Sequence, residues 1–247
     1  MIEVRGLRKR FGPNRVLDGV DLTINDGESL VIIGQSGTGK SVLLKHIIGL
    51  MRPDEGQVIV DGQDLGALRG PELMATRRRF GYLFQGAALF DSLTVGENVG
   101  LALSEHGGIS REEIGRRVTE KLAMVGMSGV EHLKPADLSG GMRRRVGLAR
   151  ALATEPAYIL YDEPTTGLDP VMSDSINRLI RKLDETGVTS VTVTHDMHSA
   201  YFIADRVAML HQGRIIFTGT PQETRDADIP VVQQFIEGSS EGPLAAL

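Results

Sequence analysis

The sequence contains no cysteine among its 247 residues. This absence excludes disulfide bonds, iron–sulfur ligation and a thiol nucleophile, and it fits a reducing compartment. Long apolar runs are also missing, since no segment approaches the ~18 to 20 apolar residues that a membrane span needs. The first residues, Met1–Phe11, alternate charged and apolar side chains and lack the apolar core of a signal peptide. Any work at a membrane is therefore expected to go through a partner.

An excess of positive charge is the third feature that the sequence lacks. The 27 Lys and Arg residues face 32 Asp and Glu residues, which leaves a formal net charge of -5. A broad positive field that would attract nucleic acid or anionic lipid is therefore not expected. The runs Arg77–Arg79 and Arg143–Arg145 are interpreted as solvated faces, and no nucleic-acid partner is predicted.

Apolar residues make up 41% of the chain, which is enough to bury a continuous core. Short apolar runs predict buried parallel strands at Ser29–Ile33, Tyr158–Tyr161 and Ser190–Thr194. Each run is followed by a turn and a helical pattern, and these patterns begin at Lys40, Val171 and Met197. This alternation predicts an α/β fold with a mainly parallel core sheet.

The remaining segments predict additions to this core. Ile2–Val4, Asp18–Ile24 and Gln57–Val60 alternate with Gly and Asp turns, which favours an N-terminal antiparallel side sheet. Strand signals vanish between Asp91 and Glu155, so an inserted helical subdomain is expected there. A hairpin is predicted at Gln212-Gly213, and the last ten residues are small and polar enough to fray.

These segments predict three parts of the chain. The α/β core with its side sheet takes 1–90 and 156–228, the helical subdomain takes 91–155, and a C-terminal docking tail takes 229–247. The tail is predicted to bury Val231, Val232, Phe235 and Ile236 on one face of a short helix, against either its own sheet or a second subunit.

A glycine-rich phosphate loop, Gly34–Ser41, lies between the strand ending at Ile33 and the helix opening at Lys40. That context is what the phosphate-loop pattern requires, because glycines let backbone N–H groups converge where the positive end of a helix also points. Lys40 is expected to reach the β- and γ-phosphates of ATP, and the Ser41 hydroxyl to bind Mg²⁺. The sequence therefore predicts an ATPase.

A carboxylate pair, Asp162 and Glu163, follows the predicted strand that ends at Tyr161. Ligands of open α/β sheets bind at such carboxyl ends of strands. Asp162 is expected to hold Mg²⁺, and Glu163 to polarise the attacking water as general base, because that role needs a carboxylate that the metal does not consume.

A second small-residue segment, Leu138-Ser139-Gly140-Gly141-Met142, opens a helix that is expected to run to about Ala153. Taken with the phosphate loop and the Asp162-Glu163 strand, its order and spacing resemble the ATPase subunits of ABC transporters over nearly the whole chain. The resemblance implies that Ser139, Gly140 and Gly141 serve the nucleotide held in the phosphate loop of a second copy of the chain.

Further site residues are implied by the same resemblance. Phe11 matches the aromatic residue that stacks on adenine, and Gln85 matches the glutamine that touches Mg²⁺ and water. Asp169 matches the residue that contacts the other subunit, and His195 matches the histidine that contacts the γ-phosphate. The loop residues expected to bind phosphate are Gly34, Ser36, Gly37, Thr38, Gly39, Lys40, Ser41 and Val42. Val42 and Met142 depart from the commoner Thr and Gln; weaker nucleotide binding is the most that Val42 implies.

We call Leu138–Met142 the signature segment. One subgroup, the ATPases of Mla/MCE-type lipid transporters, resembles this chain in three places: the signature segment, which ends in Met142, the stretch Phe84–Leu93, and the tail residues 234–238 and 242–243. The resemblance implies a homodimer on the cytoplasmic side of the inner membrane. It also implies an integral membrane permease, through which alone the membrane is contacted, with an MCE-domain protein and a small STAS-domain protein. Lipid identity and transport direction stay open.

Three other functions remain as alternatives. The ATPase of a polar-solute importer, for example for amino acids, shares every motif, and a partner permease would distinguish it. An ABC ATPase acting on ribosomes or DNA ends usually has two cassettes or a long coiled-coil insert. A small-molecule kinase would leave Ser139–Met142 unexplained and would need an acceptor for phosphate.

Overall fold

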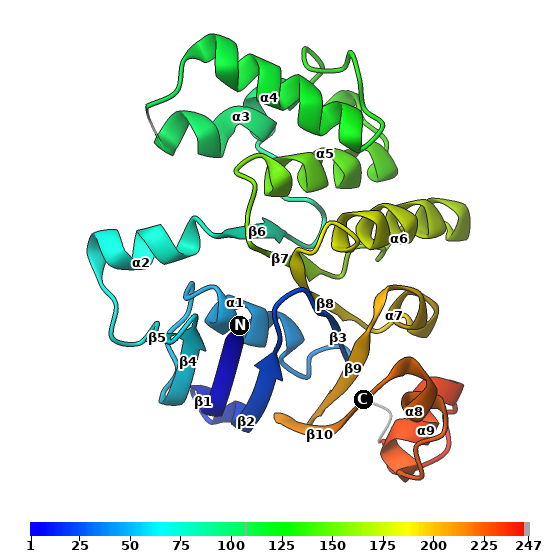
Figure 1. Ribbon diagram of the computed structural model, residues 1–247. Helices are drawn as coiled ribbons and strands as arrows, with labels where there is room; N and C mark the ends of the chain where they lie inside the picture. Colours follow the sequence, from blue (N-terminus) through cyan, green and yellow to red (C-terminus); the bar gives the residue numbers. More distant parts are fainter. Residues whose placement is uncertain (107, 245–247) are drawn as a thin grey trace. The chain divides into compact units, whose positions relative to one another are not determined.

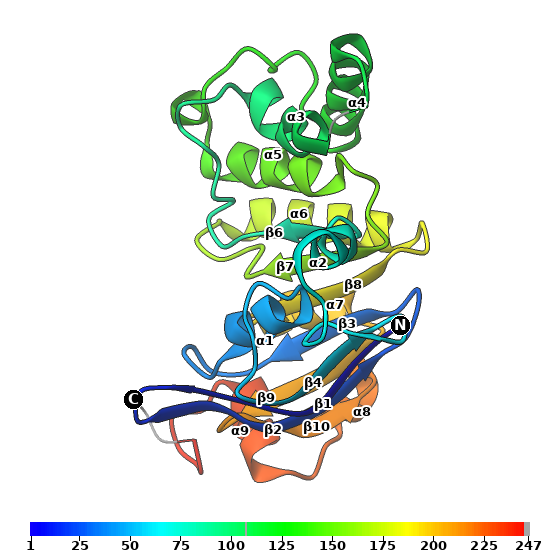
Figure 2. The ribbon, with the colours of Figure 1, turned by 90° about the vertical axis from the view of Figure 1, so that its left-hand side faces the viewer.

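The computed structural model describes residues 1–106 and 108–244. The chain forms two compact units, which we call unit 1 (Met1–Arg77 with Thr189–Leu247) and unit 2 (Arg78–Val188). Figures 1 and 2 show the helices and strands of both. The boundaries of core, helical subdomain and tail given above stay a prediction.

An antiparallel sheet forms the N-terminal part of unit 1, with the strand order β2-β1-β4-β5. Its strands are β1 (Ile2–Phe11), β2 (Asn14–Ile24), β4 (Glu55–Val60) and β5 (Gln63–Asp64). β1 pairs with β2 and with β4, so that Ile2 faces Ile24 on one side and Val60 on the other. The three side chains are buried. The predicted side sheet is confirmed.

A second, mainly parallel set of strands in unit 1 has the order β10-β9-β3-β8. Its members are β3 (Ser29–Ile33), β8 (Thr189–Thr194), β9 (Arg206–His211) and β10 (Arg214–Gly219). β3 pairs in parallel with both β8 and β9, and all its residues are buried, which accounts for its unbroken apolar sequence. β9 and β10 form the predicted hairpin, whose turn residues Gln212 and Gly213 both have positive φ, 46° and 74°.

The helices of unit 1 are α1 (Lys40–Ile47), α2 (Gly70–Arg77), α7 (Met197–Ile203), α8 (Pro221–Arg225) and α9 (Pro230–Glu237). α1 follows β3 and α7 follows β8, as the alternating pattern predicts. Asp196 caps α7, because its carboxylate accepts from the backbone N–H groups of His198 and Ser199.

Unit 2 contains two parallel strands, β6 (Phe80–Leu83) and β7 (Tyr158–Asp162), with Leu83 opposite Tyr161. Its helices are α3 (Val95–His106), α4 (Arg111–Met124), the short 3₁₀ helix Pro135–Asp137, α5 (Gly140–Leu152) and α6 (Pro170–Asp184). Within the described part of 91–155 the regular structure is helical. Together, these elements confirm the expected α/β fold.

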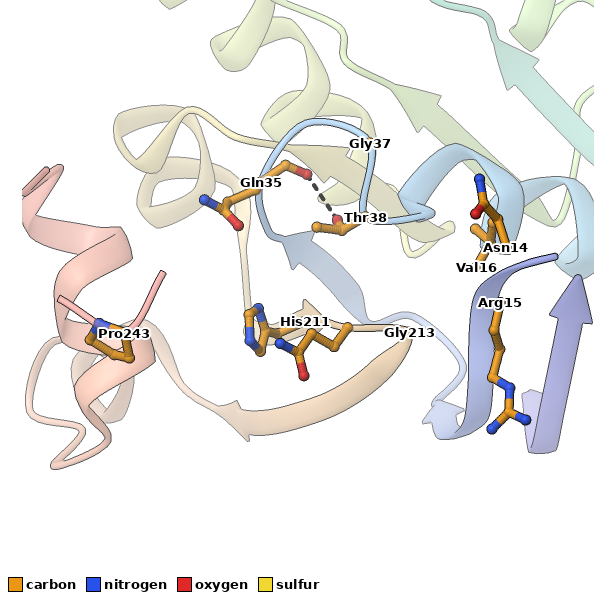
Figure 3. A pocket seen from close by; sticks show the side chains of 10 residues that line it. Asn14, Arg15, Val16, Gln35, Gly37, Thr38, His211, Gly213 and Pro243 are labelled. Atoms are coloured by element: carbon orange, nitrogen blue, oxygen red, sulfur yellow. Dashed lines mark hydrogen bonds between the residues drawn. The ribbon is translucent and has the colours of Figure 1, made fainter. Parts of the chain in front are cut away.

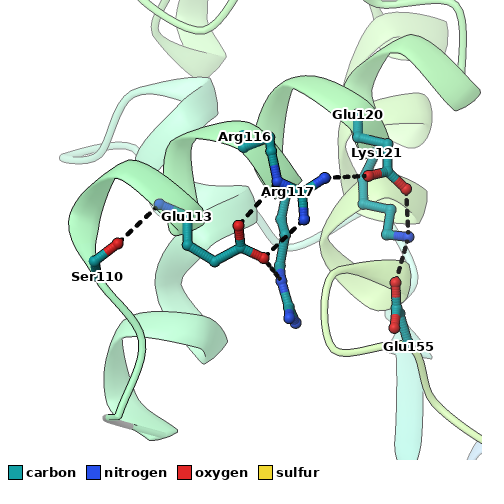
Figure 4. A network of polar contacts seen from close by, with 7 residues as sticks. All are labelled: Ser110, Glu113, Arg116, Arg117, Glu120, Lys121 and Glu155. Carbon is teal, nitrogen blue, oxygen red and sulfur yellow. Dashed lines mark hydrogen bonds and ion pairs between the residues drawn. The ribbon is translucent and has the colours of Figure 1, made fainter.

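Polar contacts along α4 show how its sequence supports the helix (Figure 4). Ser110 is the N-cap, and its hydroxyl accepts from the N–H of Glu113 at 3.2 Å. The Glu113 carboxylate binds Arg116 and Arg117, and these hydrogen bonds lower its pKa to about 2. No helix among the described residues has the length and apolar character that crossing a bilayer requires.

The C-terminal segment folds back on α9 instead of fraying, at least as far as the described residues extend. Gln234 is buried; its side-chain amide accepts from the N–H of Leu244 at 2.6 Å and donates to the carbonyls of Ser239 and Leu244. Leu244 and Val232 are buried as well. The expectation that Gly238–Leu247 frays is wrong for residues 238–244, because a buried amide needs backbone partners and finds them there.

We expect truncation after Arg225 to destabilise the isolated chain. It removes α9 with Val232 and Leu244, and burial of an apolar side chain of this size contributes ~1.5 to 3 kcal/mol before the entropy of ordering is subtracted. Urea denaturation of dilute, nucleotide-free protein measures the loss, and Glu237→Ala on the exposed side of the same helix is the control. An unfolding midpoint equal to that of the full chain would contradict an intramolecular role.

Candidate active site

The phosphate loop connects β3 to α1 in unit 1, and its glycines are required by close packing. A Cβ on Gly34, whose φ is 153°, would lie 2.4 Å from the carbonyl oxygen of Leu210 on β9. A Cβ on Gly39, at φ 101°, would lie 2.8 Å from Cγ1 of Val16 on β2. Larger residues at these positions would displace backbone or core, so the loop conformation is set by its surroundings as well as by its own sequence.

Lys40 lies across this loop and is almost fully buried. Its Nζ donates to the carbonyls of Gly34 at 2.7 Å and Gln35 at 2.9 Å, and Thr38 Oγ1 donates to the same Gln35 carbonyl at 2.8 Å. Gly39 is the N-cap of α1 and makes no side-chain cap hydrogen bond, and the first turn of the helix has no acidic residue. The helix start therefore combines the positive end of the helix dipole with a cation, an arrangement that favours phosphate binding.

A pocket of about 510 Å³ lies beside the loop in unit 1 (Figure 3). Its lining residues come from β2, the loop, the β9–β10 turn and the C-terminal segment: Asn14, Arg15, Val16, Gln35, Gly37, Thr38, His211, Gln212, Gly213 and Pro243. Phe11, at the end of β1, is 44% exposed, with Lys9 Nζ 5.7 Å from its ring centre. His195 is exposed directly after β8. In this unit Phe11 and His195 are thus exposed, whereas Gly34, Gly39 and Lys40 of the phosphate loop are buried.

Asp162 and Glu163 lie at the carboxyl end of β7 in unit 2, and both are buried. The hydroxyl of Tyr82 on β6 donates to Asp162 Oδ2 at 3.1 Å. Burial and the neighbouring carboxylate raise the pKa of the Tyr82 phenol above its usual range, so it stays a donor. Sequence reasoning missed Tyr82, although its strand leads to Gln85.

Glu163 has a left-handed backbone, with φ 51°, which is strained for a residue with a side chain. Thr166 Oγ1 donates to Glu163 Oε2 at 2.9 Å and orients the carboxylate. Further along, Asp169 caps α6, accepting from the N–H groups of Val171 and Met172 at 3.0 Å each. Asp169 is thus the N-cap of α6, whereas its role toward another subunit stays a prediction.

The signature segment starts α5. Ser139 is the N-cap, and its hydroxyl accepts from the N–H of Met142 at 3.3 Å. Gly140 is exposed, but Gly141 is buried, and a Cβ there would lie 1.9 Å from Cε of Met172 on α6. Because this Cε is the end of a flexible side chain that can move aside, the contact alone does not require glycine at this position.

Gln85 is exposed after β6 and begins a turn in which Ala87 and Ala88 both have positive φ, 67° and 44°. Arg150 on α5 holds this turn, donating from Nη2 to the Ala87 carbonyl at 2.6 Å and from Nη1 to the Ala88 carbonyl at 2.8 Å. Burial lowers the pKa of Arg150. The contact joins the signature helix to the segment carrying Gln85, and sequence reasoning did not identify it.

The residues predicted to bind Mg²⁺ do not include a cluster of acidic side chains. No group of three or more His, Cys, Asp or Glu suited to a metal occurs in the described part of the chain. Mg²⁺ does not need one, since it is usually held by one or two carboxylates together with water and substrate phosphates. Ser41 on α1, Gln85 after β6 and Asp162 on β7 all offer oxygen ligands of the type it prefers.

Comparison with known proteins defines the class. Residues 17–166 match the sequence profile of the family described as ABC transporter. By structure, the chain is similar to the dimeric ATP-binding cassette MJ0796 bound to ADP and phosphate, with a TM-score of 0.83, 37% identity, and coverage of 90% of this chain and 99% of that one. The chain belongs to the ABC transporter family, and it is an ATPase that uses ATP with Mg²⁺.

The relatives differ in the transported substrate that their names give. The probable ribonucleotide transport ATP-binding protein mkl of Mycobacterium tuberculosis is 44% identical over 98% of this chain and 68% of its own length. The intermembrane phospholipid transport system ATP-binding protein MlaF of Haemophilus influenzae is 38% identical over 99% of this chain and 93% of its own length. Sulfate/thiosulfate and methionine import ATP-binding proteins match at 45% and 46%. Identity alone leaves the transported substrate open.

Tyr82→Phe should raise the Mg²⁺ concentration needed for half-maximal ATP hydrolysis. The change removes the hydroxyl that orients Asp162, and partners of this kind are typically worth ~10- to 100-fold in metal affinity or activity. Magnesium titrations of the hydrolysis rate measure it. Tyr161→Phe is the matched control, because the Tyr161 hydroxyl is fully buried and has no hydrogen-bond partner among the described residues. Equal Mg²⁺ requirements for the two variants would show that Tyr82 does not support the metal.

Proposed function

We propose that this chain is the ATPase subunit of an Mla/MCE-type ABC transporter that moves phospholipids or related lipids between bacterial membranes. The observation that supports it is the match to MlaF, which takes in 99% of this chain and 93% of MlaF, whereas the matches to mkl and to the sulfate and methionine importers cover 68%, 66% and 65% of those proteins. The Met142 signature and the stretch Phe84–Leu93 point the same way. The chain would act on the cytoplasmic side of the inner membrane through a permease, an MCE-domain protein and a STAS-domain protein.

Two copies of the chain would hold two ATP molecules between them. The phosphate loop of one copy would bind the triphosphate through backbone N–H groups and Lys40, with adenine on Phe11. Ser139 and the N-terminal end of α5 from the other copy would contact the γ-phosphate of the same nucleotide. The solved MJ0796 cassette is a dimer, which favours this arrangement.

Hydrolysis would use side chains at the carboxyl ends of the strands. Mg²⁺, held by Ser41, Gln85 and Asp162, would neutralise charge on the phosphates. Glu163 would accept a proton from the attacking water, and His195 would contact the γ-phosphate as negative charge develops there. Thr166, which donates to Glu163 Oε2, would help to hold the carboxylate in place for this step.

Glu163→Gln should abolish hydrolysis and still bind Mg-ATP, because an amide fills the same space but cannot accept the proton of water. The variant should then elute from gel filtration as a dimer when Mg-ATP is present. Lys40→Ala, which removes the loop cation, should lose nucleotide binding and remain a monomer. If Glu163→Gln hydrolyses ATP at the parental rate, the general base is a different residue.

The lipid assignment is tested by purification of the Glu163→Gln variant from detergent-solubilised membranes of its host in Mg-ATP. We expect a permease and an MCE-domain protein in the complex, with phospholipid detected by mass spectrometry. Phospholipid should also stimulate ATP hydrolysis by the parental complex. A complex that instead contains a solute-binding protein and responds to sulfate or methionine would replace the proposal with the importer function.

A further inference from the structure

Arg144, the middle residue of the run Arg143–Arg145 on α5, is only 5% exposed. Its Nη2 donates to the carbonyl of Thr166 at 2.9 Å. The other terminal nitrogen, Nη1, is buried and has no hydrogen-bond partner among the described residues. Burying a guanidinium with an unsatisfied nitrogen is costly, so a local reason for its presence is expected.

The carboxylates of the candidate active site supply that reason. Burial lowers the pKa of Arg144, and the negative charges of Asp162 and Glu163 act in the opposite direction. The guanidinium therefore lies within the electrostatic reach of both carboxylates, in the same unit of the chain. The attraction between the Arg144 guanidinium and these two carboxylates offsets part of the cost of burying its charge.

A chain of hydrogen bonds also leads from Arg144 to Glu163. Arg144 binds the backbone carbonyl of Thr166, and the Thr166 hydroxyl donates to Glu163 Oε2 at 2.9 Å. The N–H of Thr166 additionally approaches the Glu163 carbonyl at 3.4 Å, closing a turn that starts from the left-handed Glu163. Both ends of the turn 163–166 are therefore fixed. Thr166 is bound by Arg144 on α5, and Glu163 directly follows β7.

We propose that Arg144 is a positioning residue for ATP hydrolysis, which holds the turn 163–166 through Thr166 and thereby orients the Glu163 carboxylate toward the attacking water. The inference rests on the proposed role of Glu163 as general base. It assigns a task in the chemistry to a residue of the signature helix that lies beyond the signature segment itself.

The test compares Arg144→Met and Arg144→Lys with Arg145→Met. Arg145 is a matched control: it is on the same helix and donates to the Val125 carbonyl and to Ser175 Oγ, away from the carboxylates. Steady-state ATP hydrolysis gives kcat and KM, a fluorescent ATP analogue gives the nucleotide Kd, and thermal unfolding gives Tm.

We expect Arg144→Met to lower kcat by ~10-fold or more while KM and the nucleotide Kd change by less than ~3-fold, the signature of an interaction that matters for the reaction rather than for binding. Arg144→Lys, which can still donate to the Thr166 carbonyl, should recover part of the rate. Arg145→Met should lower Tm without lowering kcat. A parental kcat in Arg144→Met, or the same loss in Arg145→Met, would overturn the proposal.

Thr166→Val provides an independent arm if Arg144→Met folds poorly. It removes the hydroxyl that binds Glu163 and should also lower kcat, while Thr166→Ser retains the rate. Because the two residues act in series, the double variant Arg144→Met/Thr166→Val should be no slower than the slower single variant, within ~2-fold. Fully multiplicative losses would mean that Arg144 does not act through Thr166.

The Glu163→Gln variant separates this inference from the proposed function. Hydrolysis at the parental rate in Glu163→Gln means that the general base is elsewhere, and the positioning role falls with it. Loss of hydrolysis in Glu163→Gln together with a parental kcat in Arg144→Met overturns the Arg144 proposal alone.

Discussion

Backbone crowding at the phosphate loop is the constraint on which the site depends. The loop passes so close to its neighbours that a Cβ on Gly34 would lie 2.4 Å from the Leu210 carbonyl, and one on Gly39 would lie 2.8 Å from Val16. These neighbours belong to β9 and β2, which come from opposite ends of the sequence. Because protein cores are close-packed, the position of the phosphate-binding backbone is determined by the sheets around it. The conformation of the loop is therefore fixed by contacts from outside the loop as well as by its own sequence.

The parts of the fold that sequence predicted best are those with local causes. β3 follows from an unbroken apolar run, and the start of α6 follows from the carboxylate of Asp169, which needs only backbone N–H groups two and three residues ahead. The interpretation of Arg143–Arg145 as a solvated face is wrong for Arg144. A local signal did exist: the positions three and four residues from Arg144 on its helix include Gly141 and Leu148, both buried.

The contacts that sequence could not predict join residues far apart in the chain. Tyr82 and Asp162 are 80 residues apart, and Arg150 is 63 residues from Ala87. Neither a tyrosine in a strand nor an arginine at the end of a helix shows in the sequence which distant group it binds. The candidate site was therefore predictable in its main-chain motifs and strand ends, but the side chains that orient those groups emerge only from the packing of the strands and helices.

Helix α5 holds strained backbone in two other segments through residues beyond its first turn. Ala87, Ala88 and Glu163 all have left-handed backbones, a conformation that costs a side-chain-bearing residue on the order of 1 kcal/mol and persists only where surrounding contacts enforce it. Arg150 supplies those contacts for the two alanines, and Arg144 supplies one beside Glu163. Both arginines stand on the helix that begins at the signature. The strained backbone of both segments is thus held by contacts from one helix, so a substitution within α5 is expected to disturb these segments even where every signature residue remains intact.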